Sequence, residues 1–356
     1  MKLFTCQHCG QLLYFENTSC ERCGHALGFL PEYTTLSALE REGELWRAAA
    51  APAKLYRACA NAAYDACNWQ IEADSTSDYC VSCQHNRMVP DLSVPENVEK
   101  WRKLQFAKNR LMYTILKLGL EHPTETQDKE RGLAFDVLAD PPAPTADAPK
   151  VMTGHDNGLI TIALAEADDA ERERRRTDMG EPYRTLLGHL RHEVGHYYWD
   201  RLVADRGVFD EFRALFGDER HDYGEALQIH YARKDADRWD DSYVSSYARA
   251  HAWEDFAETW AHYLHIVDTL ETAAAFRIRV DPHAAKADDL SAEVDFDVYR
   301  VPTIEPIVDA WLPLSFAVNS LNRSMGHPDL YPFVLSPAVI EKLGYIHRLV
   351  RQGKPN

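Results

Sequence analysis

All eight cysteines of this chain lie in its first quarter, and the 273 residues that follow Cys83 contain none. The N-terminal residues hold no apolar stretch of the length found in secretory signal peptides, so we expect a reducing, cytoplasmic compartment. Clustered cysteines in that compartment bind metal more often than they form disulfides. The cysteines therefore predict that metal sites organise the N-terminal part of the fold.

The first group consists of two Cys-x-x-Cys pairs, and a glycine follows each pair. Four thiolates suit tetrahedral zinc, and so short a segment has too little core to fold without the metal. We predict a zinc ribbon over residues 1–30 that holds one structural zinc ion. Its ligands would be Cys6, Cys9, Cys20 and Cys23.

The second group ends in another Cys-x-x-Cys pair, within the segment "DYCVSC". One pair supplies only two ligands, so the two cysteines upstream are the candidates that complete a second structural zinc site. They could instead be small buried hydrophobic residues, which is a common role of free cysteine, and His85 could then replace one of them as a ligand. We place this site in an alanine-rich module, predicted to be helical, over residues 31–92. The ligands would be Cys59, Cys67, Cys80 and Cys83.

The net charge and the length of the chain limit the possible functions and the number of domains. The 39 basic and 56 acidic side chains give a net charge of −17, which argues against binding to the nucleic-acid backbone as the main role. No window approaches the roughly 18 consecutive apolar residues of a membrane span, so we expect a soluble protein without a membrane partner. At roughly 150 residues per domain, the chain of 356 residues allows two or three domains.

Periodicity predicts the elements beyond residue 92. Apolar residues at three- and four-residue spacing indicate a long helix from Pro95. The turn signal Asn157-Gly158 predicts a hairpin between residues 150–152 and the strand that follows it. The remaining elements are strands at 133–138 and 158–164 and helices at 304–323 and from Ser336-Pro337.

The segment "HEVGH" places His192 and His196 four residues apart, so a helix would project both rings from one face. Zinc held by two imidazoles acts as a Lewis acid and lowers the pKa of its bound water. Glu193, beside the pair, would take the proton from that water as general base. The pattern therefore predicts a hydrolytic zinc site whose third ligand lies further along the chain.

Trp199 and Leu202 stand where the metzincin arrangement needs glycine and histidine, so that arrangement is excluded. A later helix, "HAWEDFAETWAHYLH", carries Glu254 and Glu258 one turn apart among apolar residues. Such carboxylates are costly to bury unless they are paired or bind metal. We predict Glu254 as the third ligand and Glu258 as the acceptor that orients a ligand histidine through its outer N–H. A solvated acidic face that includes Asp255 is the alternative, and the rival ligands are His251, His262 and His265.

The motif "HEVGH" followed by "EDFAE" resembles the gluzincin metallopeptidases, and "SYARAHAWEDFAE" is similar to the corresponding segment of anthrax lethal factor. In that protein a tyrosine seven residues before the zinc glutamate stabilises the oxyanion. The resemblance implies Tyr247 as oxyanion donor, a contact of a kind with known catalytic value. An aromatic ring packed against the helix start is the alternative role for Tyr247. The resemblance also implies the roles given above to His192, His196, Glu254, Glu193 and Glu258.

The whole chain, through "CNW", "YCVSC", "PDLS", "MGEPYRTLLGHLRHEVGHYYW" and "EDFAETWAHYLH", resembles the bacterial zinc-ribbon "putative zinc-binding metallopeptidase" family. We expect an α+β protein with a zinc ribbon (1–30), a cysteine-zinc helical module (31–92) and a mainly helical, gluzincin-like metallopeptidase domain with a small sheet (93–356). It would hold one catalytic and two structural zinc ions. In gluzincins an edge strand pairs with the extended substrate, and "GLITIAL" at 158–164 is the candidate.

The predicted function is zinc-dependent hydrolysis of peptide or isopeptide bonds in a peptide or protein substrate. Two other classes stay open. One is an amidohydrolase acting on a non-protein amide, with the same site in a small closed pocket. The other is a non-catalytic adaptor whose zinc ribbon binds a protein partner or nucleic acid, while the HEVGH site only stabilises the fold.

Overall fold

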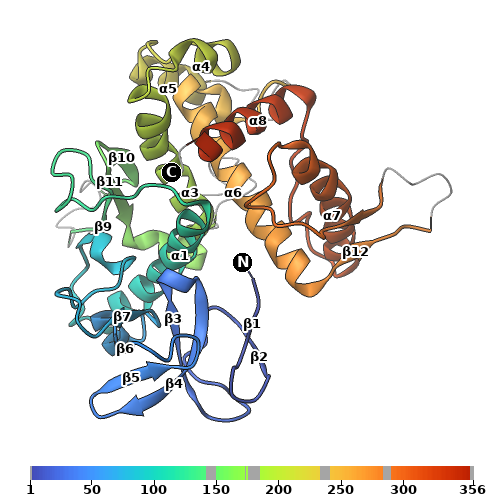
Figure 1. Cartoon of the computed structure of the whole chain (residues 1–356). Coiled ribbons are helices and arrows are strands. Elements are labelled where there is room, and N and C mark those ends of the chain that lie inside the picture. Colours follow the sequence, from blue (N-terminus) through green and yellow to red (C-terminus); the bar gives the residue numbers. More distant parts are fainter. Residues whose placement is uncertain are drawn as a thin grey trace. The chain divides into compact units, whose positions relative to one another are not determined.

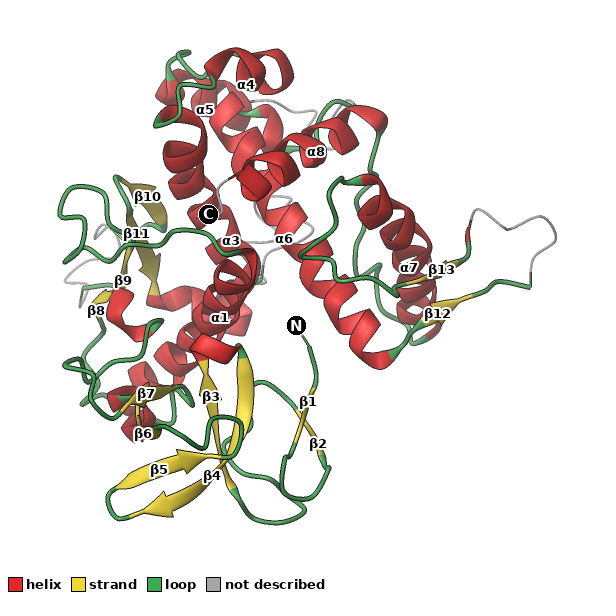
Figure 2. Ribbon diagram, in the orientation of Figure 1, coloured by secondary structure: helices red, strands yellow, loops and turns green. Residues whose placement is uncertain are grey.

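The computed structural model describes residues 2–141, 150–172, 174, 185–232, 241–283 and 290–352. The chain divides into two compact units, Met1–Arg172 and Glu173–Asn356. Strands dominate the start of the first unit, and helices dominate the second (Figure 2). The α+β class predicted from the sequence is confirmed. Among the described residues, no helix is both long and apolar enough to cross a lipid bilayer.

The first unit begins with a small hairpin and a five-stranded antiparallel sheet. The hairpin pairs β1 (Phe4–Thr5) with β2 (Leu12–Leu13). The sheet has its strands in chain order, and its first strand starts just after the second cysteine pair (Figure 1). Its strands are β3 (Ala26–Leu30), β4 (Thr35–Glu42), β5 (Leu45–Ala48), β6 (Leu55–Ala58) and β7 (Gln70–Glu72).

The prediction that residues 31–92 form a helical module is wrong. Apart from the strands, this segment contains only short 3-10 helices within the described chain: η1 (Pro31–Tyr33), η2 (Ala60–Tyr64) and η3 (Cys83–His85). The high helix propensity of alanine is a weak prior, and helices of fewer than about 12 residues are marginal without tertiary support. Gly43, with φ of +63°, instead turns the chain between β4 and β5, so that both strands join the sheet.

The second half of the first unit follows the sequence-based prediction closely. The helix α1 (Pro95–Leu118) starts at the predicted proline. A four-stranded sheet has the order β10-β11-β9-β8 and comprises β8 (Asn86–Met88), β9 (Ala134–Leu138), β10 (Gly154–Asp156) and β11 (Leu159–Ala163), with η4 (Leu164–Ala167) after it. The hairpin at Asn157-Gly158 is confirmed, but its first strand is β10 rather than residues 150–152.

The prediction that "GLITIAL" is an edge strand is wrong. β11 pairs with β10 on one side and with β9 on the other, so its backbone groups are already engaged. The turn explains why, because both Asn157 and Gly158 have positive φ and so form a tight hairpin that adds one more strand outside β11. The edge on that side of the sheet is β10.

An aromatic cluster joins the pieces of the first unit. Phe15 from the predicted ribbon lies with its ring centroid 4.9 Å from Phe29 of β3 and 5.5 Å from Tyr113 of α1. Trp69 lies 4.6 Å from Phe29. Residues 1–30 therefore share a core with the sheet and α1. Whether the predicted segments 1–30, 31–92 and 93–356 fold separately stays a prediction.

The second unit is built around one long helix, α6 (Ala252–Phe276), and four α-helices pack most extensively against it. These are α3 (Leu186–Trp199), α4 (Phe209–Phe216), α7 (Glu305–Ser324) and α8 (Pro337–Gln352). The helices predicted near 304–323 and from Pro337 are thus confirmed. The unit also contains a π turn, η5 (Asp200–Ala204), the helix α5 (Tyr223–Ala232), a 3-10 turn, η6 (Tyr247–Arg249), and the strand pair β12 (Arg279–Val280) and β13 (Ala292–Glu293).

Candidate functional site

The two histidines of the motif lie on one face of α3, as predicted. Thr185 caps this helix, since its side chain accepts a hydrogen bond from the Gly188 amide at 2.9 Å. Both histidines are buried, and their Nε2 atoms are 3.2 Å apart. The helix therefore presents two imidazole nitrogens at one point.

Close packing of α3 on α6 brings a carboxylate to the same point. A Cβ at Gly195 would lie 3.0 Å from the Ala257 Cα, so the glycine of the motif allows this approach. Glu254, in the first turn of α6, places its Oε2 3.0 Å from His192 Nε2 and 3.6 Å from His196 Nε2.

The donor set fits a divalent transition metal. His192 Nδ1 donates to Glu258 Oε1 at 2.8 Å, so the neutral form of that ring keeps its lone pair on Nε2, which faces the Glu254 carboxylate. Electron pairs that face one another in a buried site repel unless a metal ion or a proton lies between them. Two imidazoles and a carboxylate are a usual ligand set of zinc sites that keep an open position.

Burial alone would lower the pKa of His192, but its bonds to Glu254 and Glu258 raise it well above its usual value, so a proton can lie between the donor atoms where a metal ion would bind. Burial alone would raise the pKa of Glu254, but His196 and His192 lower it well below the usual range of a carboxyl. Burial works against the charged form of Glu258 as well, yet the hydrogen bond from His192 lowers its pKa. Both glutamates therefore remain carboxylates. Ser245, which the sequence did not single out, donates to Glu258 Oε2 at 2.7 Å and helps to hold it.

Glu193 and Tyr247 lie beside this group without belonging to it. Glu193 is buried on α3, with its Oε1 3.5 Å from His189 Nε2. The Tyr247 ring lies 5.9 Å from the His192 ring, between centroids. Burial and the Glu254 charge raise the pKa of Tyr247 above its usual value, so its hydroxyl keeps its proton. Glu193 also lies near enough to Tyr247 for its charge to contribute to the raised pKa of that phenol.

Tyr223 is a site residue that the sequence analysis missed. Its hydroxyl donates to Glu254 Oε1 at 2.5 Å. Partial burial, and then the negative charge of Glu254, raise the pKa of Tyr223, so its hydroxyl remains a donor. No motif marks this residue, because it precedes Glu254 by 31 positions and lies on a separate helix, α5.

The rival ligands have other partners. His251 caps α6: its Nδ1 accepts from the Trp253 amide at 3.1 Å. His262 Nδ1 lies 2.6 Å from the Tyr331 hydroxyl, and His265 Nδ1 contacts Arg191. The solvated acidic face is excluded, because Glu254 and Asp255 are 1% and 0% exposed.

The cysteines gather as the sequence predicts. Cys6 and Cys23 have Sγ atoms 3.7 Å apart, and those of Cys9 and Cys20 are 3.6 Å apart. Both upstream cysteines join the second group, with Cys67 Sγ 3.7 Å from Cys80 Sγ and Cys59 Sγ accepting from the Cys80 amide at 3.4 Å. His85 is engaged with Leu133 O at 2.7 Å, so it is not a substitute ligand. Four groups of ligand atoms close enough to hold a metal occur among the described residues: Cys6/Cys9/Cys20/Cys23, Cys59/Cys67/Cys80/Cys83, His8/Cys23/His25 and His192/His196/Glu254.

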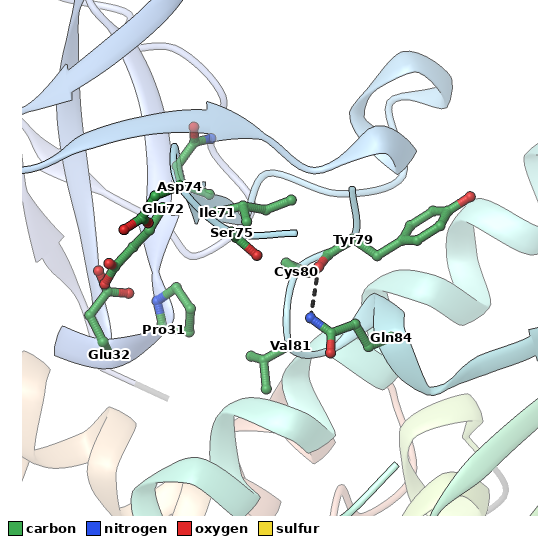
Figure 3. A pocket seen from close by; sticks show the side chains of 11 residues that line it. Pro31, Glu32, Ile71, Glu72, Asp74, Ser75, Tyr79, Cys80, Val81 and Gln84 are labelled. Carbon is green, nitrogen blue, oxygen red and sulfur yellow. Dashed lines mark hydrogen bonds between the residues drawn. The ribbon is translucent and has the colours of Figure 1, made fainter. Parts of the chain in front are cut away.

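A pocket of about 340 Å³ lies in the first unit, beside the second cysteine group (Figure 3). Its lining includes Glu32, Asp74 and Tyr79, and the Tyr79 carbonyl accepts a hydrogen bond from Gln84 Nε2 at 2.9 Å. Cys80 is the one lining residue that also belongs to a predicted metal site. The residues predicted for catalysis are not part of this pocket.

Known proteins match the chain along its whole length. A family model described as "Putative zinc-binding metallo-peptidase" matches residues 97–349, and a zinc-ribbon domain model matches residues 3–94, which include both cysteine groups. The chain is similar to uncharacterized protein Mb2598c of Mycobacterium bovis and uncharacterized protein Rv2568c of Mycobacterium tuberculosis. Each is 43% identical over 357 residues, which cover 100% of this chain and 97% of the relative. No solved structure matches the chain.

The family match, the zinc-ribbon match and the grouped cysteines agree on zinc as the metal that this protein binds. The chain belongs to the family of "putative zinc-binding metallo-peptidases", with a zinc-ribbon domain at its N-terminus.

Proposed function

We propose that the second unit is a zinc-dependent hydrolase of peptide or isopeptide bonds, and that His192, His196 and Glu254 hold its catalytic zinc. The convergence of their three donor atoms, with His192 Nδ1 already engaged by Glu258, is the observation that carries this proposal. Two further zinc ions would occupy the four-cysteine groups and serve the fold. Zinc in the His-His-Glu site would polarise the scissile carbonyl and lower the pKa of a water.

Glu193 is the proposed general base. It lies between the two histidines in sequence, yet its carboxylate is outside the ligand group, so it is free of metal and can take the proton of the attacking water. The proton then passes from Glu193 to the leaving nitrogen when the C–N bond breaks. Glu258 orients His192 through Nδ1, and Ser245 orients Glu258.

Tyr247 is the proposed donor to the developing oxyanion. Its hydroxyl keeps its proton, and its ring lies beside His192. Removal of such a donor costs about 100-fold or more in turnover where it has been measured. Tyr247→Phe is therefore expected to lower turnover by about that factor while zinc content stays unchanged.

The test compares wild type with Glu193→Gln on a proteome-derived peptide library and reads new termini by mass spectrometry. Glu193→Gln should keep all its zinc and lose turnover by several orders of magnitude, because it removes the proton acceptor and no ligand. Glu254→Gln is the matched variant, since the same chemical change on a ligand should also lower the zinc content. New termini of equal number with wild type and Glu193→Gln would overturn the proposal.

The library also separates the other two classes of function. An amidohydrolase of non-protein amides would leave the peptides intact but cleave small acylated amines, and that cleavage would be lost in Glu193→Gln. An adaptor would cleave neither kind of substrate.

A further inference from the structure

The helix α5 lies against the candidate zinc site although it has little core of its own. None of its ten residues, all within the described chain, is buried. It nevertheless reaches the site at two places. Tyr223, at its start, donates to Glu254 Oε1. His230, seven residues further along the helix, lies with its ring centroid 5.6 Å from that of Tyr247.

Tyr223 is held in place by rings at the start of α6. Its ring centroid lies 5.4 Å from that of His251 and 5.8 Å from that of Trp253, both nearly perpendicular to it. His251 in turn contacts the His221 carbonyl at 3.1 Å, two residues before Tyr223. The segment that carries the phenol is therefore fixed to the same turn of α6 that carries Glu254.

We infer that Tyr223 is a positioning residue for the zinc site. Its hydroxyl holds Glu254 so that Oε2 alone faces the two histidines. The inference rests on the proposed zinc site of the second unit. A carboxylate can bind a metal through one oxygen or through both. Hydrogen bonds to ionised acceptors are short and strong, and the bond to Oε1 is 2.5 Å long.

The geometry of the carboxylate agrees with this role. Oε1 is engaged by Tyr223, while Oε2 lies 3.0 and 3.6 Å from the two Nε2 atoms. Coordination through one oxygen leaves a position of the metal open for water and substrate. Without the phenol, Glu254 could rotate and bind through both oxygens, which would fill that position.

The test uses the full-length protein with Tyr223→Phe, which deletes the hydroxyl and keeps the ring packed between His251 and Trp253. Outer-sphere hydrogen-bond partners typically change metal affinity by about 10- to 100-fold, so we expect zinc to bind the His-His-Glu site about 10-fold more weakly. His230→Ala is the matched control, because it loosens a contact of α5 with Tyr247 and leaves in place the hydroxyl that bonds Glu254. It should leave zinc affinity unchanged.

A spectroscopic measurement distinguishes a Tyr223 that positions Glu254 from a Tyr223 that only supports α5. Cobalt(II) is loaded in place of zinc, and the visible spectrum of the site is taken as the difference from a His192→Ala/His196→Ala variant. Tyr223→Phe should weaken the absorption bands of cobalt, as expected when coordination number rises, while His230→Ala should reproduce the wild-type spectrum. Equal zinc affinity and equal spectra in wild type and Tyr223→Phe would overturn the inference.

Failure of the inference and failure of the proposed function give different results. If wild type and the double histidine variant bind the same number of zinc ions, the zinc site itself is absent, and both proposals fall. If the double variant loses one zinc ion but Tyr223→Phe behaves as wild type, only the role of Tyr223 is rejected.

Discussion

The two units assemble their predicted metal ligands in opposite ways. In the first unit, the cysteines of the first group come from two turns. Strands of two residues each, β1 and β2, flank the first pair, and β3 follows the second pair. In the second unit, all three ligands lie on long helices, α3 and α6, which pack closely through Gly195. We expect the first arrangement to need a metal that holds its parts together, and the second to form as soon as the helices pack. We therefore expect zinc to build structure in the first unit and to enter a finished site in the second.

The second cysteine group shows how the first unit accommodates the charge of its thiolates. Lys108 of α1 is buried, and its Nζ donates at 3.0 Å to the carbonyl of Ser82, which lies between Cys80 and Cys83 in sequence. Burial lowers the pKa of Lys108, while the charges of the thiolates, Cys83 first, raise it. Asn109 donates to Cys67 Sγ at 3.8 Å. We expect this buried lysine and the amide to offset part of the negative charge that four thiolates bound to zinc would carry.

The largest effect should come from removal of zinc. Structural zinc contributes about 10 to 16 kcal/mol of binding energy to small zinc domains, so a strong chelator should unfold much of the first unit, whose aromatic core includes Phe15 and Phe29. Helices α3 and α6 should keep their structure. Hydrogen exchange measured by mass spectrometry would show fast exchange in residues 2–72 and protected amides in α3 and α6. Equal loss of protection in both units would break the comparison.

A mutational version of this experiment gives the matched control. The purified protein should contain three zinc ions. Cys6→Ser with Cys9→Ser should lose one of them together with protection in the first unit, while His192→Ala should lose one with α3 and α6 still protected. Collapse of the second unit in His192→Ala would show that its zinc is structural.

The next largest effect concerns a buried ion pair, which we expect to stabilise the second unit as zinc stabilises the first. Lys342 of α8 lies 2.6 Å from Asp255 Oδ2 and donates to the Ser242 carbonyl at 2.5 Å, and both side chains are buried. Lys342→Met leaves Asp255 buried without its cation, so we expect a loss of about 3 to 5 kcal/mol in the free energy of unfolding. Lys54→Met, which breaks the exposed pair with Glu72, should cost far less because water screens that pair. Unfolding by denaturant measures the free energy of unfolding of both variants.

The loss in Lys342→Met should depend on pH in a defined direction. Burial raises the pKa of Asp255 to about 7, although Lys342 lowers it. A carboxyl whose folded pKa lies above its unfolded value takes up a proton on folding, so stability falls as pH rises between the two values. The variant lacks the cation, so its Asp255 should have a still higher pKa. We therefore expect Lys342→Met to be more destabilised at about pH 8 than at about pH 5.5.

The same contrast explains what could be predicted from the sequence. Periodicity within one element was enough for α1, α3, α6, α7 and α8, because each helix carries its own pattern. The Cys-x-x-Cys pairs could be recognised for the same reason, because each pair lies within one short segment. The strands between Thr35 and Glu72 were missed, since a short strand is stabilised by partners elsewhere in the chain. Tyr223 and Lys342 were missed because they reach their acidic partners across 31 and 87 residues, with no motif at either end.

A smaller effect tests how much of the second unit's site depends on hydrogen bonds around the ligands. Glu258→Ala removes the acceptor of His192 Nδ1, so we expect zinc affinity to fall by about 10- to 100-fold. Ser245→Ala should cause a smaller fall, because Glu258 keeps its bond to His192. Glu341→Ala, at an exposed position of α8, is the control that should change nothing. Zinc competition with a chromophoric chelator measures all three, and unchanged affinity in Glu258→Ala would mean that packing alone orients His192.

The smallest effect tests whether the site of the second unit exists through packing alone. Gly195→Ala places a Cβ 3.0 Å from the Ala257 Cα, closer than such atoms normally approach, so α3 must move away from α6 by a few tenths of an ångström. Overpacking of this kind costs about 1 to 3 kcal/mol. The higher helix propensity of alanine offsets about 1 kcal/mol of this cost, so the net loss in the free energy of unfolding should be about 1 kcal/mol.

Gly224→Ala in α5 separates the two contributions, because it makes the same change in a helix where the nearest atom, Asp222 Oδ1, is 3.4 Å from the added Cβ. It should stabilise the protein or leave it unchanged. Gly195→Ala should also weaken zinc binding, because the histidines on α3 and Glu254 on α6 would then be held further apart. A variant that loses stability but keeps full zinc affinity would show that the ligands adjust to the metal, and the second unit would then resemble the first.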